Sequence, residues 1–156
     1  MAARLSADSA LKMIDKIKGN VREMKEGDKK FVNQISVPIY ADVIRHFKDE
    51  EGEDGPWEEW SDEYFFKMAE KGRGDNQILQ YNGRLKNTFK PRKWKRGKDG
   101  VVWYNNAKTK DEFPYAFAHN EGGDTLPKRD FMWLSGAPMN LISQVAARYF
   151  VDGIGD

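Results

Sequence analysis

The sequence contains no cysteine, which excludes disulfide bridges, a thiol nucleophile and zinc sites built on cysteine. No apolar run reaches the roughly 18 residues that a membrane-spanning helix requires. The segment Met1–Ala10 holds a single arginine and no apolar stretch, so it does not resemble a signal peptide. A formal net charge of +1 leaves nothing to draw the whole protein toward nucleic acid or a membrane. We therefore expect assembly inside a cell, without a membrane partner.

The sequence also has little that could support catalysis. Its two histidines, His46 and His119, share no metal-ligand spacing, and each is expected to be a hydrogen-bonded structural residue. The run Gly72-Arg73-Gly74 lacks the lysine and the following Ser or Thr of a phosphate-binding loop, and the Gly-x-Ser-x-Gly pattern is absent. We therefore expect a protein that is not an enzyme and has no catalytic residue, metal or cofactor.

The length of 156 residues suits one domain, residues 1–156, with one hydrophobic core. Two apolar stripes in residues 1–48 predict helices. The first ends near Gly27 and consists of Leu11, Ile14, Ile17, Val21 and Met24. The second consists of Ile35, Ile39, Val43 and Phe47. This second stripe fits either a helix that begins near Ser36 or one longer helix kinked at Pro38.

The pattern changes after residue 48. Residues 49–77 are an acidic and Gly-rich loop region, with a short helix expected at Tyr64–Lys71. Residues 136–152 carry the apolar spacing of a closing helix. Residues 78–135 have β-rich character, with strand patterns at 85–94, 101–104 and 127–134, a turn at 95–100, and a strand or short helix at 115–119. The fold class predicted is α+β, with N-terminal helices, a small antiparallel sheet with a long hairpin, and a C-terminal helix.

Charge is segregated along the chain. Residues 49–63 hold nine acids and no base, but they lack the alternating ligand order of a calcium loop. We expect an exposed acidic loop whose tryptophans, Trp57 and Trp60, fold back onto the core. Residues 90–98 hold six bases around Trp94. This basic segment is either a solvated hairpin tip or a surface that contacts phosphates and stacks a base on Trp94.

A third interpretation uses both segments, because opposite patches on one molecule favour head-to-tail contacts that close into rings when the rotation permits. The basic candidates for such an assembly interface are Lys90, Arg92, Lys93, Trp94, Lys95, Arg96 and Lys98. The acidic candidates are Asp49, Glu50, Glu51, Glu53, Asp54, Trp57, Glu58 and Glu59. Reversing the charges of Lys93, Lys95 and Arg96 should then block assembly.

Sequence landmarks occur in a characteristic order from Phe47 to Ser135. They are Phe47, Pro56-Trp57, Ile78-Leu79-Gln80, Gly83-Arg84-Leu85, Tyr115-Ala116, His119, Gly122-Gly123, Pro127-x-Arg129-x-Phe131 and Leu134-Ser135. This order resembles the phage virion morphogenesis family, which includes tail-completion proteins of temperate myophages. Asp130 stands where that family usually has a proline. The residues that we assign to the fold signature are Gly83, Arg84, Leu85, Tyr115, His119, Gly122, Pro127, Arg129 and Phe131.

Physical roles follow for some of these positions. Gly83 suits a bend into a strand, and Gly122 suits a turn with positive φ. The planar fork of Arg129 can hold a carboxylate or backbone carbonyls.

The resemblance implies a structural virion protein of a tailed bacteriophage, a tail-completion or neck protein at the head–tail junction. It implies a homo-oligomeric ring, a hexamer by analogy, assembled in the host cytoplasm and located in the neck or the head-proximal end of the tail. Expected partners are further copies, neighbouring neck, connector or tail proteins, and packaged DNA in the channel. One alternative is a tail terminator that caps the tail tube. Another is a nucleic-acid-binding protein that uses residues 90–98.

Overall fold

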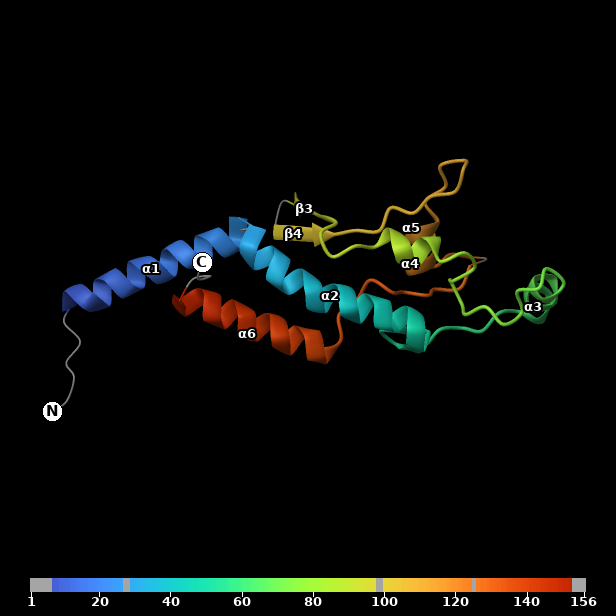
Figure 1. Ribbon diagram of the computed structural model, residues 1–156, viewed down its shortest axis with the longest axis horizontal. Helices are drawn as coiled ribbons and strands as arrows, with labels where there is room; N and C mark the ends of the chain where they lie inside the picture. Colours follow the sequence, from blue (N-terminus) through green and yellow to red (C-terminus); the bar gives the residue numbers. More distant parts are fainter. Residues whose placement is uncertain (1–6, 27–28, 98–99, 125, 153–156) are drawn as a thin grey trace.

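A computed structural model describes residues 7–26, 29–97, 100–124 and 126–152 (Figure 1). Its helices are α1 (Ala7–Glu26), α2 (Lys29–Asp49), α3 (Asp62–Ala69), α4 (Arg84–Thr88), α5 (Tyr115–Glu121) and α6 (Gly136–Asp152). Its strands are β1 (Glu51–Gly52), β2 (Gly55–Pro56), β3 (Trp94–Gly97) and β4 (Gly100–Trp103), which form two antiparallel pairs, β1–β2 and β3–β4. The predicted α+β class, with N-terminal helices and a C-terminal helix, is confirmed.

Helices α1, α2 and α6 form the elongated frame (Figure 1). Helix α2 contains Pro38 in its interior, so the longer of the two helices predicted there is the one observed. Helix α6 runs antiparallel to α2, since Ser135 before α6 contacts Asp42 and Tyr149 near its end contacts Phe31, with ring centroids 5.3 Å apart. None of the described helices combines the length and the apolar character that crossing a bilayer demands.

The hydrophobic core lies where α2 packs against the segments that contain Trp57 and Phe131. Phe47 at the end of α2 is fully buried, and its ring centroid lies 5.0 Å from that of Phe131 and 5.7 Å from that of Trp57. The indole nitrogen of Trp57 donates a hydrogen bond to the carbonyl of Asp130 at 2.9 Å. Trp60 is half-buried and packs against the same cluster. The prediction that both tryptophans fold back onto the core is confirmed.

The hairpin β3–β4 packs against the N-terminal half of α2, because Trp103 donates a hydrogen bond from its indole nitrogen to the hydroxyl of Ser36 at 3.1 Å. Trp94 pairs with Trp103 in the ladder, and Lys95 pairs with Val102. Trp94 and Trp103 contact the core cluster, whereas Lys95 and Val102 are exposed, as the alternation of a strand requires. Each arm has four residues, so the hairpin is shorter than predicted.

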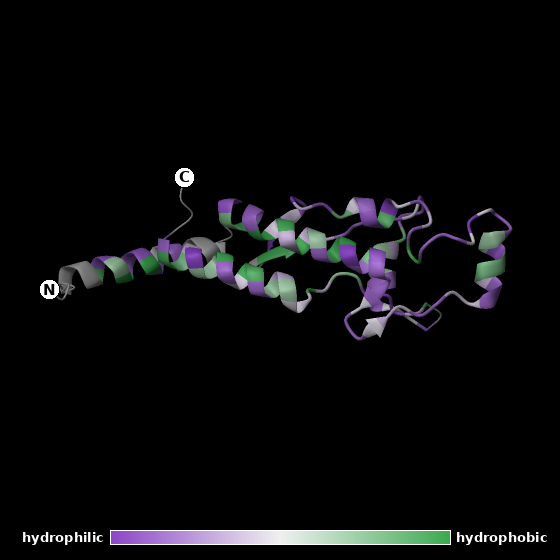
Figure 2. Cartoon of the chain, turned by 60° about the horizontal axis from the view of Figure 1, so that its bottom comes forward, coloured by the Kyte–Doolittle hydropathy of each residue, from purple (hydrophilic) through white to green (hydrophobic). Residues whose placement is uncertain are grey.

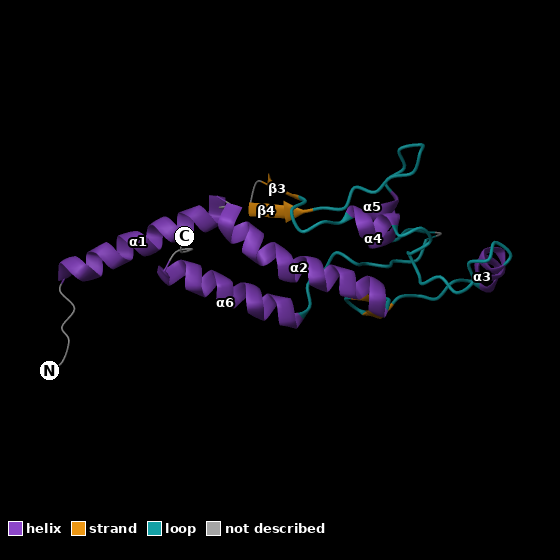
Figure 3. Ribbon diagram, viewed as in Figure 1, coloured by secondary structure: helices purple, strands orange, loops and turns teal. Residues whose placement is uncertain are grey.

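The prediction of a β-rich region at 78–135 is wrong in two places (Figure 3). Within the predicted strand at 85–94, residues 84–88 form α4. Leu85 and Phe89 are buried whereas Asn87 between them is exposed, which fits a helix and not a strand, where all three would share one face.

Residues 127–134, predicted to be a strand, belong to none of the strands β1 to β4. There the amide of Asn120 accepts hydrogen bonds from the backbone N–H groups of Phe131 and Met132, at 3.2 and 3.1 Å. Nδ1 of His46 lies 3.1 Å from the carbonyl oxygen of Phe131, which can only accept. Side chains therefore take the place of a neighbouring strand.

Asp42 joins α2 to the start of α6. Its carboxylate is buried and accepts hydrogen bonds from the backbone N–H of Ser135 at 2.7 Å and from the Ser135 hydroxyl at 2.8 Å. The Arg45 guanidinium lies 3.1 Å away, and Nε2 of His46 lies 3.5 Å away. Burial alone would raise the pKa of Asp42, but the bonds from Ser135 and Arg45 outweigh it, so the pKa is lower than usual. A negative charge before the N-terminus of α6 also suits the helix dipole.

We expect Asp42→Asn to lower the free energy of unfolding by about 1–3 kcal/mol, because an amide has only one acceptor oxygen and its NH₂ would face a donor, either the N–H of Ser135 or the Arg45 guanidinium. Urea denaturation at pH 7 measures this loss. Asp49→Asn is the matched control, since Asp49 is exposed and only ion-paired to Arg45 at 3.3 Å, so its loss should stay below about 1 kcal/mol.

The same substitution should alter acid sensitivity. The ordinary pKa of an aspartate is 3.8, and that of folded Asp42 is lower. The stability due to Asp42 is therefore present above that ordinary pKa and is lost as the pH falls through the folded pKa. Asp42→Asn should lose less stability than the wild type over this acidic range. An equal loss in both proteins would contradict the role of the Asp42 charge.

Candidate functional site

The cations of the basic hairpin divide into exposed ones and ones bound within the subunit. Among the exposed ones, Nζ of Lys95 lies 5.6 Å from the centroid of the Tyr104 ring. Lys93 donates hydrogen bonds to the carbonyl of Thr88 at 3.2 Å and to the side-chain amide of Asn106. Trp94 packs against the core. Lys98 lies outside the described residues. The exposed cations of this segment are Lys90, Arg92, Lys95 and Arg96, and none of them forms an ion pair within the described part of the chain.

The acidic loop is held in place by Asp130. The carboxylate of Asp130 accepts a hydrogen bond from the backbone N–H of Glu53 at 3.1 Å. A Cβ atom at Gly52 would lie only 2.2 Å from this carboxylate, so the close approach requires glycine. Asp130 thus anchors the acidic loop to the 127–134 segment.

Some predicted acidic candidates serve the fold. Glu50 accepts a hydrogen bond from the backbone N–H of Ile78 at 2.5 Å, and Asp49 and Glu51 lie 3.3 and 3.5 Å from Arg45. Trp57 is buried. The acids that extend into solvent are Glu53, Asp54, Glu58 and Glu59, of which Asp54 lies 3.6 Å from Lys128.

The basic hairpin and the acidic loop lie at different positions along α2 (Figure 1). The hairpin contacts α2 at Ser36, and the acidic loop begins at its end, Asp49. Thirteen helical residues correspond to about 20 Å along the axis. The structure therefore keeps the two patches apart on one elongated molecule and does not pair them with each other.

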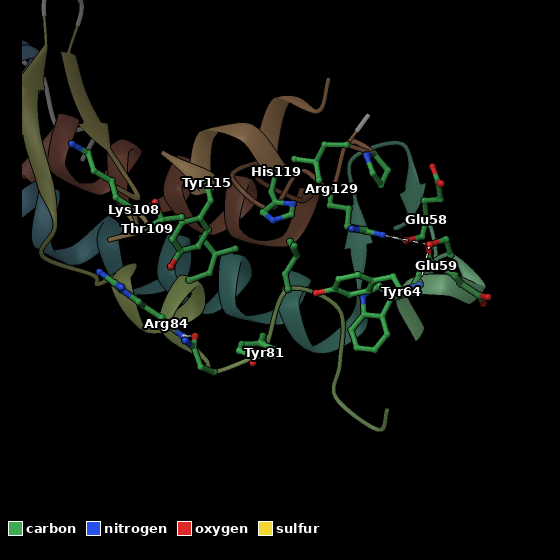
Figure 4. Close-up of a pocket in the computed structure, with 17 residues that line it drawn as sticks. Glu58, Glu59, Tyr64, Tyr81, Arg84, Lys108, Thr109, Tyr115, His119 and Arg129 are labelled. Carbon is green, nitrogen blue, oxygen red and sulfur yellow. Dashed lines mark hydrogen bonds between the residues drawn. The ribbon is translucent and has the colours of Figure 1, made fainter. Parts of the chain in front are cut away.

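A pocket of about 620 Å³ lies beside the acidic loop (Figure 4). It gathers six of the nine fold-signature residues, which come from three separate segments: Arg84, Leu85, Tyr115, His119, Pro127 and Arg129. The remainder of its lining includes residues that the sequence analysis did not propose for a site, among them Tyr64, Lys108 and Thr109. These residues come from distant parts of the chain, so no local spacing could have indicated that they share a pocket.

Arg129 closes one end of the pocket. Its guanidinium donates hydrogen bonds to the carbonyl of Glu58 at 3.0 and 2.9 Å and to that of Glu59 at 3.3 Å. The predicted choice between a carboxylate and backbone carbonyls is thus resolved in favour of carbonyls. Burial lowers the pKa of Arg129, and the charge of Glu58 opposes this effect. An arginine remains charged in proteins, so Arg129 ties the acidic loop to the 127–134 segment as a cation.

The two predicted glycine roles have different outcomes. Gly122 has a φ of 74°, as predicted, and a Cβ there would lie 2.9 Å from the backbone nitrogen of Lys128. Gly83 has a φ of 69° but precedes the helix α4, so the prediction of a bend into a strand is wrong. The side chain of Asn82 accepts a hydrogen bond from the backbone N–H of Arg84 at 3.0 Å, which favours the helical start.

The two histidines are both structural neighbours of the core. His46 is fully buried and stacks on Trp133, with ring centroids 4.1 Å apart. His119 lines the pocket, and its carbonyl accepts a hydrogen bond from the backbone N–H of Arg129 at 2.8 Å. Nδ1 of His119 is buried without a hydrogen-bond partner in the described residues. Burial, and secondarily the charge of Arg129, lower the pKa of His119.

We expect the protein to lose stability as the pH falls through about 6.5, the ordinary histidine pKa. The unfolded chain takes up a proton there that folded His119 disfavours, so this contribution to stability is complete above that pKa and declines below it. Urea midpoints measured at pH 7.5 and 5.5 test this. His119→Asn should show a smaller pH dependence, and an unchanged dependence would contradict the assignment.

Within the described residues, no group of three or more His, Asp or Glu side chains is placed to hold a metal ion. The pocket combines aromatic and aliphatic walls with the cations Arg84 and Lys108 on one side and, on the other, the acids Glu58 and Glu59 beside Arg129 (Figure 4). This arrangement suits the binding of a polypeptide segment with apolar side chains and charged flanks.

Comparisons with known proteins do not test the family resemblance, which rests on the sequence landmarks alone. No protein-family model matches the chain, and neither a curated protein nor a solved structure matches it.

Proposed function

We propose that this protein is a structural component of a tailed-bacteriophage virion, a tail-completion or neck protein that acts at the head–tail junction as a ring of identical subunits. The observation that carries the proposal is the order of sequence landmarks from Phe47 to Ser135. Six signature residues from this order surround one pocket. Because these residues lie together around one pocket, they support a shared structural role.

The separation of the charged patches supports self-assembly. A basic patch and an acidic patch at different positions along one elongated molecule are complementary between copies and cannot neutralise each other within one copy. Head-to-tail contact through such patches generates a ring when the rotation between subunits closes. We infer that the exposed cations Arg92, Lys95 and Arg96 of one subunit face the acids Glu53, Asp54 and Glu59 of the next.

A primary role in binding nucleic acid is less well supported. Stacking of bases requires an accessible aromatic face, and Trp94 packs against the core of its own subunit. The exposed cations around it still suit contacts to phosphate in the channel of a ring. A salt-sensitive gel shift that disappears when Arg92, Lys95 and Arg96 are neutralised would restore this alternative.

The decisive experiment deletes the gene from the phage genome and inspects the lysate by electron microscopy. We expect DNA-filled heads beside separate tails of normal length. Tails of uncontrolled length would instead identify a tail terminator. Infectious particles of normal shape would contradict a role in the virion. Complementation with the intact gene on a plasmid is the control, and it should restore joined particles.

A further inference from the structure

Helix α1 has an apolar stripe that its own subunit leaves uncovered. Helix α6 reaches α1 at Asn20, whose side-chain amide donates a hydrogen bond to the carbonyl of Phe150 at 3.1 Å. Beyond that contact α1 extends past the end of α6 (Figure 1). Leu11 and Ile14 on this extension are 60% and 46% exposed, whereas Val21, near the contact, is half-buried. Figure 2 shows apolar residues along the extension, which we call the α1 arm (residues 7–19).

The pocket at the other end of the molecule has apolar walls that suit these side chains. Its walls include the aromatic rings of Trp60, Tyr64 and Tyr115 and the aliphatic side chains of Leu79 and Leu126. The volume of about 620 Å³ falls in the range typical of sites that bind small apolar groups. Insertion of apolar side chains spaced three or four residues apart on a helix is a recurrent mode of recognition. Leu11 and Ile14 have this spacing.

The charges around the two surfaces also match. The arm carries three cations, Lys12, Lys16 and Lys18, against two acids, Asp8 and Asp15, so it has a slight excess of positive charge. The edge of the pocket carries Glu58 and Glu59, and α3 begins with two further acids, Asp62 and Glu63. A cationic helix is therefore attracted to this edge and oriented by it.

The arm cannot reach the pocket of its own subunit, because the two lie at opposite ends of the frame (Figure 1). We propose that the α1 arm of one subunit docks into the pocket of the next subunit. The contact is heterologous, so it can repeat from one subunit to the next. This inference rests on the self-assembly in the proposed function and names the surfaces that mediate it.

Engineered cysteines test the proposal directly, because the natural chain has none. The test variant carries Ile14→Cys and Glu59→Cys, and a short bis-maleimide reagent links thiols that lie close together. We expect a ladder of covalent oligomers on a denaturing gel, since each subunit links to the next. The reaction is carried out on concentrated purified protein and on particles from a complemented deletion phage.

The matched control replaces Ile14→Cys by Leu141→Cys, because Leu141 on α6 is also 46% exposed. The arm pair should link more efficiently than this control pair by about tenfold or more, as expected for neighbouring thiols held at high effective concentration. Equal linking of the two pairs would overturn the proposal. Efficient dimers from Ile14→Cys alone would also overturn it, because they would mean that two arms pair with each other.

Failure of this inference is distinguishable from failure of the proposed function. If the gene deletion separates heads from tails but the arm pair links no better than its control in particles, the arm contact is wrong and the virion role stands. If the deletion leaves normal particles while the purified protein forms the ladder, the arm contact stands and the virion role is wrong.

Discussion

Reversing three exposed charges of the basic hairpin is expected to abolish assembly while leaving the fold intact. The substitutions are Arg92→Glu, Lys95→Glu and Arg96→Glu, and they avoid Lys93 because its ammonium is bound to Thr88 and Asn106 within the subunit. Like charges brought together at an interface cost several kcal/mol, so subunit association should weaken by about a thousandfold. Plating efficiency on a complemented deletion phage and sedimentation of the purified protein measure the loss.

A charge swap provides the sharpest test of complementarity. The acidic partner set, Glu53→Lys, Asp54→Lys and Glu59→Lys, should block assembly alone and restore it when combined with the basic-to-acidic set. Reversal of Lys67, Lys71 and Lys110, which lie outside both patches, changes net charge equally and should leave assembly unchanged. Normal assembly of the hairpin variant, or an equal defect in this control, would refute the contact between the two patches.

Phe131→Ala should cause the largest loss of stability that we predict. The side chain is 1% exposed, and its ring lies 5.0 Å from that of Phe47, centroid to centroid. Truncating a buried phenylalanine removes its transfer free energy and leaves a cavity, which together cost about 3–5 kcal/mol. Most domains are stable by only about 5–15 kcal/mol, so much of the total stability would be lost. A lower urea midpoint with an unchanged slope would measure this effect.

Phe117→Ala is the matched control, because Phe117 on α5 is 67% exposed and carries the same ring. Its effect should stay within about 0.5 kcal/mol. A small loss for Phe131→Ala, near that of the control, would mean that the 127–134 segment is not anchored through this ring. The adjacent hydrogen bonds from the backbone N–H groups of Phe131 and Met132 to the side chain of Asn120 would then be its main attachment.

Helices were predictable from the sequence wherever one face is apolar over several turns. The stripe from Leu11 to Met24, the stripe from Ile35 to Phe47 and the spacing in residues 136–152 each produced a helix close to the expected bounds. Such periodicity is a local property, because the same residues that repeat in sequence share one side of the helix. The hairpin was likewise indicated by the β-forming residues at 101–104, and β3 and β4 pair antiparallel, whereas residues 98 and 99 of the predicted turn lie outside the described residues.

The irregular segments were decided by tertiary contacts. Residues 127–134 have strand-like composition, but the side chains of Asn120 and His46 satisfy their backbone instead of a neighbouring strand. Residues 85–94 were predicted to be a strand, but α4 formed at residues 84–88 because Leu85 and Phe89 both reach the core. No sequence pattern indicated the role of Asp42, because its hydrogen-bond partner Ser135 lies 93 residues away. No pattern within one segment records a contact of this kind.

The sequence by itself determined which chemistry the protein carries: its charges in two separate blocks, its landmarks in family-like order, and no cysteine. Only the tertiary structure decided which of those groups are free to act. It bound Lys93, Trp94 and Glu50 within the subunit and left Arg92 and Lys95 in solvent. It also brought six signature residues around one pocket at the end opposite the α1 arm. The physical reason is that the type and order of the residues are local properties of the chain. The exposure of each side chain and its distance from other side chains depend on how α2 packs against segments distant in sequence.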